Sequence, residues 1–292
     1  MFQKQHEKPI AVVGFGGCGC NAVQFSADRP LDNTDYYFCE TKTLPRKSHN
    51  VKQFMIKEGD MEFQVCKIAD NVLRTKPLIV IIISGMGGQT VSRFAPAFAE
   101  EMKRRGVCVI SALTRPFLYE GTIAYDLVKE CIPKIEEVSD ALLLLDSDKL
   151  SESYKDRLAS EFFGEIDKIF DTLIWCISAF VDLGKSAIED LCSMLGNGKQ
   201  MIIGNGQGAS VKESLKAALA YPQSYGESFK GAEELIVYAG NHRVEISKEL
   251  AVYQDSSHIR IVDLIKSADA RVAILAVAGK NDNICKYEKS ND

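Results

Sequence analysis

The sequence predicts an α/β protein in which a parallel sheet is covered by helices on both faces and is followed by a smaller α+β unit. Three observations support this. Short apolar runs alternate with helical patterns through the first half of the chain, the runs are continuously apolar, and glycine turns follow two of them. Continuously apolar strands are typical of parallel sheets that are buried on both sides.

The expected elements follow from this alternation. In the first half, apolar runs predict strands at 10–14, 35–39, 78–83, 107–112 and 141–145. Helical spacing of apolar residues predicts helices between them, at about 20–27, 60–74, 89–105 and 122–138. A long helical pattern follows at about 153–179, and its length suits a helix that joins two domains. The second unit is expected to hold helices at about 184–195 and 210–220 and strands at about 233–239, 257–264 and 271–278.

Composition limits the classes of function. The chain has 292 residues, of which 46% are hydrophobic and 26% are charged, and its net charge of −5 does not favour nucleic acid or an anionic membrane as a partner. The apolar runs are too short to span a bilayer, and the polar first residues lack the apolar core of a signal peptide. The nine cysteines show no zinc-ligand spacing. We therefore expect a cytoplasmic protein with reduced thiols, no metal site and no direct membrane insertion.

The segment IAVVGFGGCGCNAV (10–23) is the most informative turn of the chain. An apolar strand runs directly into Gly14, Gly16, Gly17 and Gly19, and a helical pattern begins near Asn21. Glycines let the backbone approach a ligand closely, and a helix N-terminus offers unpaired N–H groups and a positive dipole end. The turn therefore predicts a phosphate site, and hence a nucleotide-binding protein.

Several motifs, taken in order, resemble the tubulin/FtsZ superfamily, and bacterial FtsZ most closely. GFGGCGCNAV is similar to the family's phosphate loop GxGGxGxNAV, SGMGGQTVSRFAPAFAEEM to its tubulin-signature region, and TRPFLYEG to its KPFxFEG. DALLLLDSDKL and MIIGNGQGASVKESLKAALAYP are similar to two later motifs, and RIVDLIKSADARVAILAVAG fits the closing β-hairpin. The similarity spans roughly residues 8–279 in the family's order, which is more specific than a lone glycine motif.

The resemblance implies the tubulin/FtsZ fold. Its parts are a Rossmann-like GTP-binding domain over 1–152, a central connecting helix over 153–182, a C-terminal α+β domain over 183–280 and a polar tail over 281–292. It also implies GTP or GDP as the ligand, with Mg²⁺ as the cation that would accompany it. A GTPase of this family has a site that is completed between adjacent subunits of a filament.

The resemblance also implies a set of nucleotide-binding positions, carried over one at a time. The phosphates would be surrounded by Gly16, Gly17, Cys18, Gly19, Cys20 and Asn21 in the first loop and by Gly87, Gly88, Gln89 and Thr90 in the second. Asn21 would also reach the base. Glu120 matches a ribose-contacting Glu, and Glu40 matches an acidic position after the second strand. Phe163 falls where an aromatic ring packs on guanine, and Asp167 near the carboxylate that reads the guanine N1 and N2 donors. Structural roles stay open: Glu40 and Glu120 as surface carboxylates, and Phe163 as helix core.

The chain departs from the family where the γ-phosphate and catalysis are concerned. The second loop reads GGQTVSR instead of GGGTGTG, so Val91 and Arg93 replace glycines. Either Val91 is a poor fit to a glycine conformation, or the helix starts earlier and the loop is reshaped. Arg93 is either a cation for a phosphate or a solvated side chain. The Arg expected four residues after the ribose Glu is Ala124, and KQFMIKEGDMEF stands in place of the γ-phosphate loop.

The cross-subunit catalytic loop, NxDxxD in the family, is degenerate. Its second Asp falls on Asp190, which is the candidate catalytic residue, but its Asn and first Asp fall on Lys185 and Ala187. Loss of one of two cooperating carboxylates commonly costs orders of magnitude in rate, so we expect weak or absent GTP hydrolysis. Asp190 as an ordinary helix surface charge stays open. The family's disordered linker and C-terminal peptide, which docks on membrane tethers, are not found, so recruitment by that route is not expected.

Three hypotheses of function remain. The first is a cytoskeletal, cell-division type of protein that assembles head-to-tail with itself, because such contacts do not close and so give polymers. The alternative is a non-polymerising pseudo-GTPase that regulates or scaffolds a partner filament, such as a true FtsZ or another division protein. A Rossmann-type dinucleotide enzyme is compatible with GFGGCGC and Glu40, but that fold does not call for GMGGQT, PFLYEG or the long helix.

Overall fold

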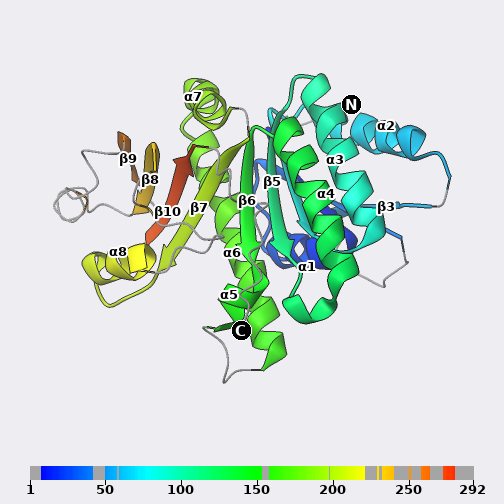
Figure 1. The fold of residues 1–292 in the computed structure, drawn as a ribbon. Coiled ribbons are helices and arrows are strands. Elements are labelled where there is room, and N and C mark those ends of the chain that lie inside the picture. Colours follow the sequence, from blue (N-terminus) through cyan, green and yellow to red (C-terminus); the bar gives the residue numbers. More distant parts are fainter. Residues whose placement is uncertain are drawn as a thin grey trace.

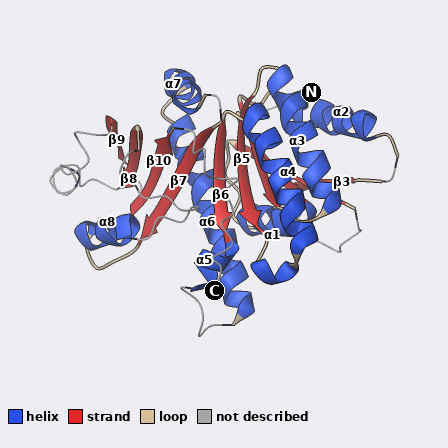
Figure 2. Ribbon diagram, viewed as in Figure 1, coloured by secondary structure: helices blue, strands red, loops and turns tan. Residues whose placement is uncertain are grey.

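The computed structural model describes residues 8–41, 50–57, 59–152, 158–196, 198–220, 229, 232–239, 250, 258–263 and 272–279. In these residues one ten-stranded sheet runs through the whole molecule in the order β3-β2-β1-β4-β5-β6-β7-β10-β8-β9 (Figures 1 and 2). The strands are β1 (Ile10–Phe15), β2 (Thr34–Glu40), β3 (Val51–Met55), β4 (Ile79–Gly85), β5 (Cys108–Arg115), β6 (Ala141–Asp146), β7 (Lys199–Gly206), β8 (Glu234–Ala239), β9 (His258–Asp263) and β10 (Val272–Ala278).

The helices connect these strands as crossovers. They are α1 (Gly16–Ala27), α2 (Met61–Val72), α3 (Gln89–Arg104), α4 (Thr122–Val138), α5 (Ser147–Glu152), α6 (Ala159–Val181), α7 (Lys185–Leu195) and α8 (Val211–Ala220), with 3₁₀ turns η1 (Leu73–Thr75) and η2 (Leu118–Glu120). The α/β class and the order of strands and helices expected for the first half are therefore confirmed.

The sheet has a parallel part and a mixed part. β3, β2, β1, β4, β5 and β6 pair in parallel, and β7 joins β6 in parallel through Ala141↔Lys199 to Leu143↔Met201. β10 then runs antiparallel to both β7 and β8. The chain leaves β1 toward β2 on one side and later returns to β4 on the other. Such a reversal of strand order is where open α/β sheets bind ligands, outside the carboxyl ends of the strands.

Both faces of the parallel part are buried, which explains the continuously apolar strands. Along β4, Ile79, Ile81 and Ile83 pack with side chains of α1, α6 and α7, whereas Val80 and Ile82 pack with side chains of α2, α3 and α4. Successive side chains of a strand point to opposite faces, so a strand covered twice needs an apolar residue at every position. Figure 1 shows α3 and α4 in front of β5 and α6 passing behind β6.

Helix α6 joins the two parts of the sheet. Its buried residues include Ile166, Phe170, Leu173 and Ile177, which belong to the same cluster as side chains of β1, β7 and β10. The helix contacts α1 on one side and β7 and β10 on the other. Over its 23 residues it spans about 35 Å, so it runs from the carboxyl ends of the parallel strands to their amino ends.

Three details of the sequence-based expectations were wrong or incomplete. β3 was not expected, because VKQFM is a half-exposed edge strand with mixed polarity. Helix α1 begins at Gly16, four residues before the expected start, because Gly17 and Gly19 of the turn lie within the helix. The two closing strands do not form a hairpin, since β8 lies between β9 and β10. The proposed division into domains stays a prediction, and the expected polar tail and residues 153–157 lie outside the described residues.

A carboxylate between α2 and α3 allows a stability prediction. The guanidinium groups of Arg104 and Arg105 donate to Glu101 at 2.8 and 2.6 Å, and they hold the pKa of this carboxyl at about 2. Glu101→Gln is therefore expected to lower the free energy of unfolding by about 2 kcal/mol at neutral pH. Because the folded pKa lies below the usual 4.5, this contribution is complete above pH 4.5 and disappears as the pH falls toward 2. Urea unfolding at several pH values measures it.

The exposed neighbour Glu100 provides the control for this prediction. Glu100→Gln should leave the unfolding free energy within about 0.5 kcal/mol of the original at every pH. An equal loss of stability in both variants would contradict the assignment of the effect to the Glu101 ion pairs.

Candidate functional site

Two helix N-termini meet at the point where the strand order reverses. Helix α1 follows β1 directly and α3 follows β4; neither has a side-chain cap, and neither carries an acidic residue in its first turn. Helix α2 is different, since the carboxylate of Asp60 accepts a hydrogen bond from the N–H of Phe63 at 3.0 Å. The first N–H groups of a helix have no partner within it, so the ends of α1 and α3 offer donors and positive dipole ends to an anion.

Glycines allow these two turns to lie against each other. Gly16 has a φ of +69°, and a Cβ added there would lie 2.6 Å from Cγ2 of Val91 in α3. A Cβ added at Gly19 would overlap the carbonyl oxygen of Ile83, so α1 packs directly on the backbone of β4. A larger residue at Gly19 must push α1 away from the backbone of β4, and one at Gly16 must displace the Val91 side chain.

The second loop is reshaped, and Val91 is not in a glycine conformation. Helix α3 begins at Gln89, so Val91 lies within its first turn. Among the described residues, only Lys76 combines a side chain with a positive φ. Of the two alternatives for this loop, the earlier helix start is therefore the one observed. Arg93 is exposed and lies on the same face of α3 as the exposed Glu100 and Arg104. Of the two alternatives for Arg93, this position favours a solvated side chain.

Cys18 lies at the centre of several predicted site residues. The Sγ atom of Cys18 is 3.7 Å from Oγ1 of Thr114, at the end of β5. A Cβ added at Gly85 would lie 2.8 Å from the Cβ of Cys18. Burial, together with the negative charges of Asp167 and Glu120, raises the pKa of the Cys18 thiol to about 11. The thiol is therefore neutral, and residues from α1, η2 and α6 lie within electrostatic reach of one another.

Aromatic side chains line the start of α6 and the loop after β5. The ring of Phe117 lies 4.8 Å from that of Tyr119 and 5.3 Å from that of Phe162. Phe162 is buried, whereas Phe163 is 53% exposed and meets Phe162 edge-on. Phe163 is thus not part of the helix core. Glu120 is exposed, and its carboxylate accepts a hydrogen bond from the N–H of Phe117 at 2.9 Å, which shapes this loop.

The remaining predicted residues of the glycine loops take varied positions. Gly17 and the exposed Asn21 lie in the first turns of α1, whereas Cys20 is buried and its thiol donates to the carbonyl of Gly14 at 3.2 Å. Gly87 has a φ of +117°, and a Cβ added there would lie 3.4 Å from Cβ of Ala124.

Other predicted residues lie at the ends of neighbouring elements. Gly88 is the N-cap of α3, and Gln89 and Thr90 are the first two residues of that helix. Glu40 ends β2, one position beyond the Phe15↔Cys39 pair and therefore beside the start of α1.

The candidate catalytic loop lies at the opposite end of α6. Asp190 is in α7, and its carboxylate pairs with the Arg260 guanidinium of β9 at 3.5 Å. Asp182, the C-cap of α6, accepts a hydrogen bond from the Asn33 amide at 2.8 Å. Because Asn33 immediately precedes β2, this end of α6 is at the amino edge of the sheet. Asp190 is therefore not brought together with Cys18, Glu120 and Asp167.

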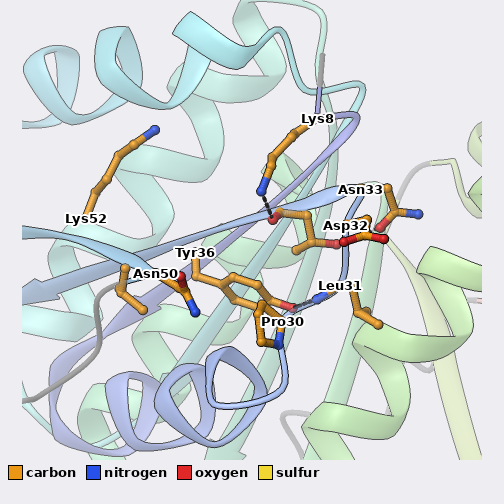
Figure 3. Close-up of a pocket in the computed structure, with 10 residues that line it drawn as sticks. Lys8, Pro30, Leu31, Asp32, Asn33, Tyr36, Asn50 and Lys52 are labelled. Carbon is orange, nitrogen blue, oxygen red and sulfur yellow. Dashed lines mark hydrogen bonds between the residues drawn. The ribbon is translucent and has the colours of Figure 1, made fainter. Parts of the chain in front are cut away.

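An open pocket of about 700 Å³ also lies at the amino edge, in a place that sequence analysis did not single out (Figure 3). Two lysines line it, Lys8 and Lys52, and both pair with Asp35, at 3.2 and 3.4 Å. The hydroxyl of Tyr36 accepts a hydrogen bond from the N–H of Leu31 at 3.3 Å. Both lysines of this wall are thus engaged with Asp35, and the pocket is separate from the glycine turns.

Sequence analysis missed the supporting residues of the site. Thr114 and Phe117 lie in TRPFLYEG, the motif from which only Glu120 was selected, and Phe162 lies one residue before Phe163. The sequence carried a signal for this contact. Phe117 and Tyr119 form an aromatic pair in the loop motif, and Phe162 and Phe163 form another at the start of a helix. No cluster of metal-ligating residues and no helix long and apolar enough to cross a membrane occur in the described part of the chain.

The comparisons with known proteins agree with this architecture. No family model matches the chain. The cell division protein FtsZ of Aquifex aeolicus is 27% identical over 254 residues, covering 78% of this chain and 68% of that protein, and FtsZ of Mycoplasmopsis pulmonis is 26% identical over 250 residues, covering 78% and 63%. Among solved structures, an empty FtsZ dimer from M. jannaschii has a TM-score of 0.75 at 20% identity, covering 95% of this chain and 89% of the other. A GTPγS-bound protofilament of CetZ2 from Haloferax volcanii has a TM-score of 0.73 at 17% identity, covering 94% and 93%.

One sheet whose parallel part has two glycine turns at its reversal point, and whose mixed part is joined to it by a long helix, defines the tubulin/FtsZ fold. The chain has this fold, and its sequence is similar to those of FtsZ cell division proteins.

Proposed function

We propose that the protein binds a guanine nucleotide and assembles head-to-tail into filaments, with weak or absent GTP hydrolysis. The observation that carries the proposal is the meeting of two uncapped helix N-termini beside Cys18, within reach of the Glu120 and Asp167 charges. This arrangement combines donors for phosphates with acceptors for a sugar and a base. The GTPγS-bound CetZ2 protofilament, which shares the fold, supports the same choice of ligand.

The chemistry of α6 favours guanine. Phe163 and Asp167 lie one helical turn apart and therefore on the same face of the helix. The exposed ring of Phe163 offers a surface on which a base can stack. The Asp167 carboxylate can accept from the two adjacent donors, N1–H and N2–H₂, that guanine presents and adenine lacks. The N–H groups of the first turns of α1 and α3 would bind the phosphates, where Mg²⁺ would supply further neutralisation of charge.

The length of α6 supports completion of the site by a second copy. Between Asp167 and Val181 the helix rises about 20 Å, so the turn before α7 cannot reach the nucleotide of its own chain. The proposed nucleotide site lies at the carboxyl ends of the parallel strands, and the turn before α7 lies at their amino ends. A copy stacked head-to-tail would bring the turn of one chain to the nucleotide edge of the next, and repetition of that contact gives a filament.

Weak hydrolysis is supported by the partners of the carboxylates near this turn. Asp190 pairs with Arg260, Asp182 accepts from Asn33, and Glu189 lies 3.7 Å from the ammonium of Lys185. A carboxylate that polarises water must face the substrate, and each of these is oriented by its own chain.

Nucleotide analysis and sedimentation test the proposal directly. The purified protein should retain GTP or GDP, and at tens of micromolar it should pellet with GTP but not without nucleotide, because ligand bound at the joint stabilises the joint. Denaturing the protein and separating the released nucleotide by chromatography identifies the ligand. A protein that stays monomeric with GTP, with GDP and without nucleotide would sink the filament proposal.

Restoring the catalytic pattern should restore hydrolysis. The combination Lys185→Asn and Ala187→Asp is expected to raise phosphate release by at least about tenfold, since it returns a second carboxylate to the loop. Release of inorganic phosphate under assembling conditions measures the rate. The matched control carries the same pair together with Asp190→Ala and should remain slow; an unchanged rate in the restored protein would show that the loop does not limit turnover.

The alternative function, a non-polymerising regulator or scaffold of a partner filament, is favoured by two features of the site. Val91 fills the space beside Gly16, and Ala124 stands where the family's phosphate-binding Arg would be. Both changes remove features of the γ-phosphate end of the site. Protein that retains no nucleotide yet co-sediments with a separate FtsZ filament would support this alternative.

A further inference from the structure

The loop after β5 is held by a carboxylate that comes from the connection after β6. Asp148, in the first turn of α5, accepts hydrogen bonds from the N–H of Leu118 at 3.0 Å and from the hydroxyl of Tyr125 at 3.5 Å. Leu118 is the first residue of η2, and Tyr125 lies in the first turn of α4. One side chain therefore joins α5 to both elements that follow β5.

The backbone that carries Asp148 is itself tied to the sheet. The carboxylate of Asp146, the last residue of β6, accepts from the N–H groups of Asp148 and Lys149 at 3.0 and 3.2 Å. It also pairs with the guanidinium of Arg115, the last residue of β5, at 3.8 Å, and both of these side chains are largely buried. The hydroxyl of Ser147 donates to the carbonyl oxygen of Arg115. Asp148 therefore has a fixed position relative to the ends of two neighbouring strands.

The loop that Asp148 holds carries Glu120, whose charge reaches Cys18 in the first glycine turn. Glu120 is exposed, and the N–H of Phe117 donates to its Oε1 atom. A carboxylate has about four lone-pair positions, so it can accept further hydrogen bonds, including those from two vicinal hydroxyls. Among the parts of a guanine nucleotide, only the ribose offers such a pair of hydroxyls.

We propose, on the basis of the function proposed above, that Asp148 is a positioning residue, which holds η2 so that Glu120 faces the ribose of the bound nucleotide. Two carboxylates then fix consecutive N–H groups of the loop: Glu120 accepts from Phe117, and Asp148 accepts from the next residue. The first of these bonds lies within the loop and can move with it. Only the bond to Asp148 ties the loop to α5, so this bond sets where Glu120 lies relative to the glycine turn.

Loss of the Asp148 carboxylate should weaken the ribose contact selectively. Asp148→Ala is expected to lower the affinity for GDP by about three- to tenfold, the range typical of one lost hydrogen bond. The affinity for 2′,3′-dideoxy-GDP, which has no ribose hydroxyls, should stay within about twofold, and so should the effect of Asp148→Ala in a Glu120→Ala background. A merely structural role would lower the affinity for both nucleotides by the same factor. Isothermal titration calorimetry measures all of these affinities.

Two variants serve as controls. Asp148→Asn keeps a side-chain oxygen that can accept from the Leu118 N–H, so it should bind GDP within about twofold of the original affinity. Asp126→Ala removes the same charge from α4, next to Tyr125. Asp126 is exposed and pairs with Lys129 of its own helix at 3.9 Å. Because exposed pairs of this kind contribute little, its loss should also change GDP affinity by less than about twofold.

Amide hydrogen exchange gives a second readout that needs no nucleotide. In the nucleotide-free protein, the Leu118 N–H should exchange faster in Asp148→Ala than in the original or in Asp148→Asn, because its acceptor has been removed. NMR measures this exchange, and circular dichroism shows that each variant is folded.

Two results would overturn the role of Asp148 and leave the proposed function standing. One is equal exchange of the Leu118 N–H in the three proteins, and the other is an equal loss of affinity for GDP and for 2′,3′-dideoxy-GDP in Asp148→Ala. A protein that binds no guanine nucleotide in any form would instead overturn the proposed function and the ribose role of Glu120 with it, even where the exchange of Leu118 depends on Asp148.

Discussion

Gly19→Ala is expected to destabilise the protein by about 3 kcal/mol and to abolish retention of nucleotide. The added methyl group would overlap the carbonyl oxygen of Ile83 and would lie 3.3 Å from the carbonyl carbon of Gly14. Both neighbours are backbone, so no change of rotamer relieves the contact, and α1 must move away from β4. That movement would also displace the N–H groups that face the phosphates. Thermal unfolding and nucleotide content of the purified protein measure the two effects.

Gly17→Ala is the matched control for stability. A Cβ added at Gly17 meets no atom within 4 Å, and the residue lies in the same helical turn. Alanine favours a helix over glycine by up to about 1 kcal/mol, so this variant should be as stable as the original or more so. If both variants melt together, the close packing of α1 on β4 does not govern the stability of this turn.

Asp167→Ala is expected to weaken guanine nucleotide binding by roughly 30- to 150-fold, or about 2–3 kcal/mol. Without the carboxylate, the N1–H and N2–H₂ donors of the base would be buried without acceptors. The loss should be smaller for inosine nucleotides, because they lack the N2 amine and keep only the N1–H donor. Titration with fluorescent GDP and IDP analogues measures both affinities.

Asp171→Ala provides the control for Asp167. Asp171 lies one turn further along α6, and its carboxylate pairs with Arg29 at 3.9 Å, away from the proposed base. The Asp171→Ala variant should bind GDP with an affinity within about twofold of that of the original protein. A second readout needs no nucleotide: since the Asp167 charge raises the pKa of the Cys18 thiol, Asp167→Ala should lower that pKa. Equal GDP affinities in the two variants would remove Asp167 from the base site.

Much of the fold could be predicted because burial on both faces leaves a strong trace in sequence. β4 is apolar from Ile79 to Ile83, since its residues alternately meet helices on the two sides of the sheet. β3 could not be found in this way. As an edge strand it has one paired side and exposed side chains, such as Met55, so its sequence carries no such pattern.

The candidate site could be predicted only in part. The order of the motifs indicated Glu120 and Asp167 as site residues. It did not indicate that the charges of both raise the pKa of Cys18, because their approach to Cys18 depends on how η2 and α6 pack around α1. The pairing of Asp190 with Arg260 likewise joins residues far apart in the chain. Sequence spacing also left two conformations open at Val91, and the start of α3 at Gln89 selected one of them.

The sequence by itself determined the class of fold, the order of most of its elements and the similarity to FtsZ proteins, because these depend on local patterns: apolar periodicity, glycine turns and short motifs in a set order. The tertiary structure alone decided which side chains meet. It brought Cys18, Glu120 and Asp167 to the carboxyl edge and sent Asp190 to the far end of α6. Such contacts arise from the packing of whole elements, and no local pattern in the chain encodes them.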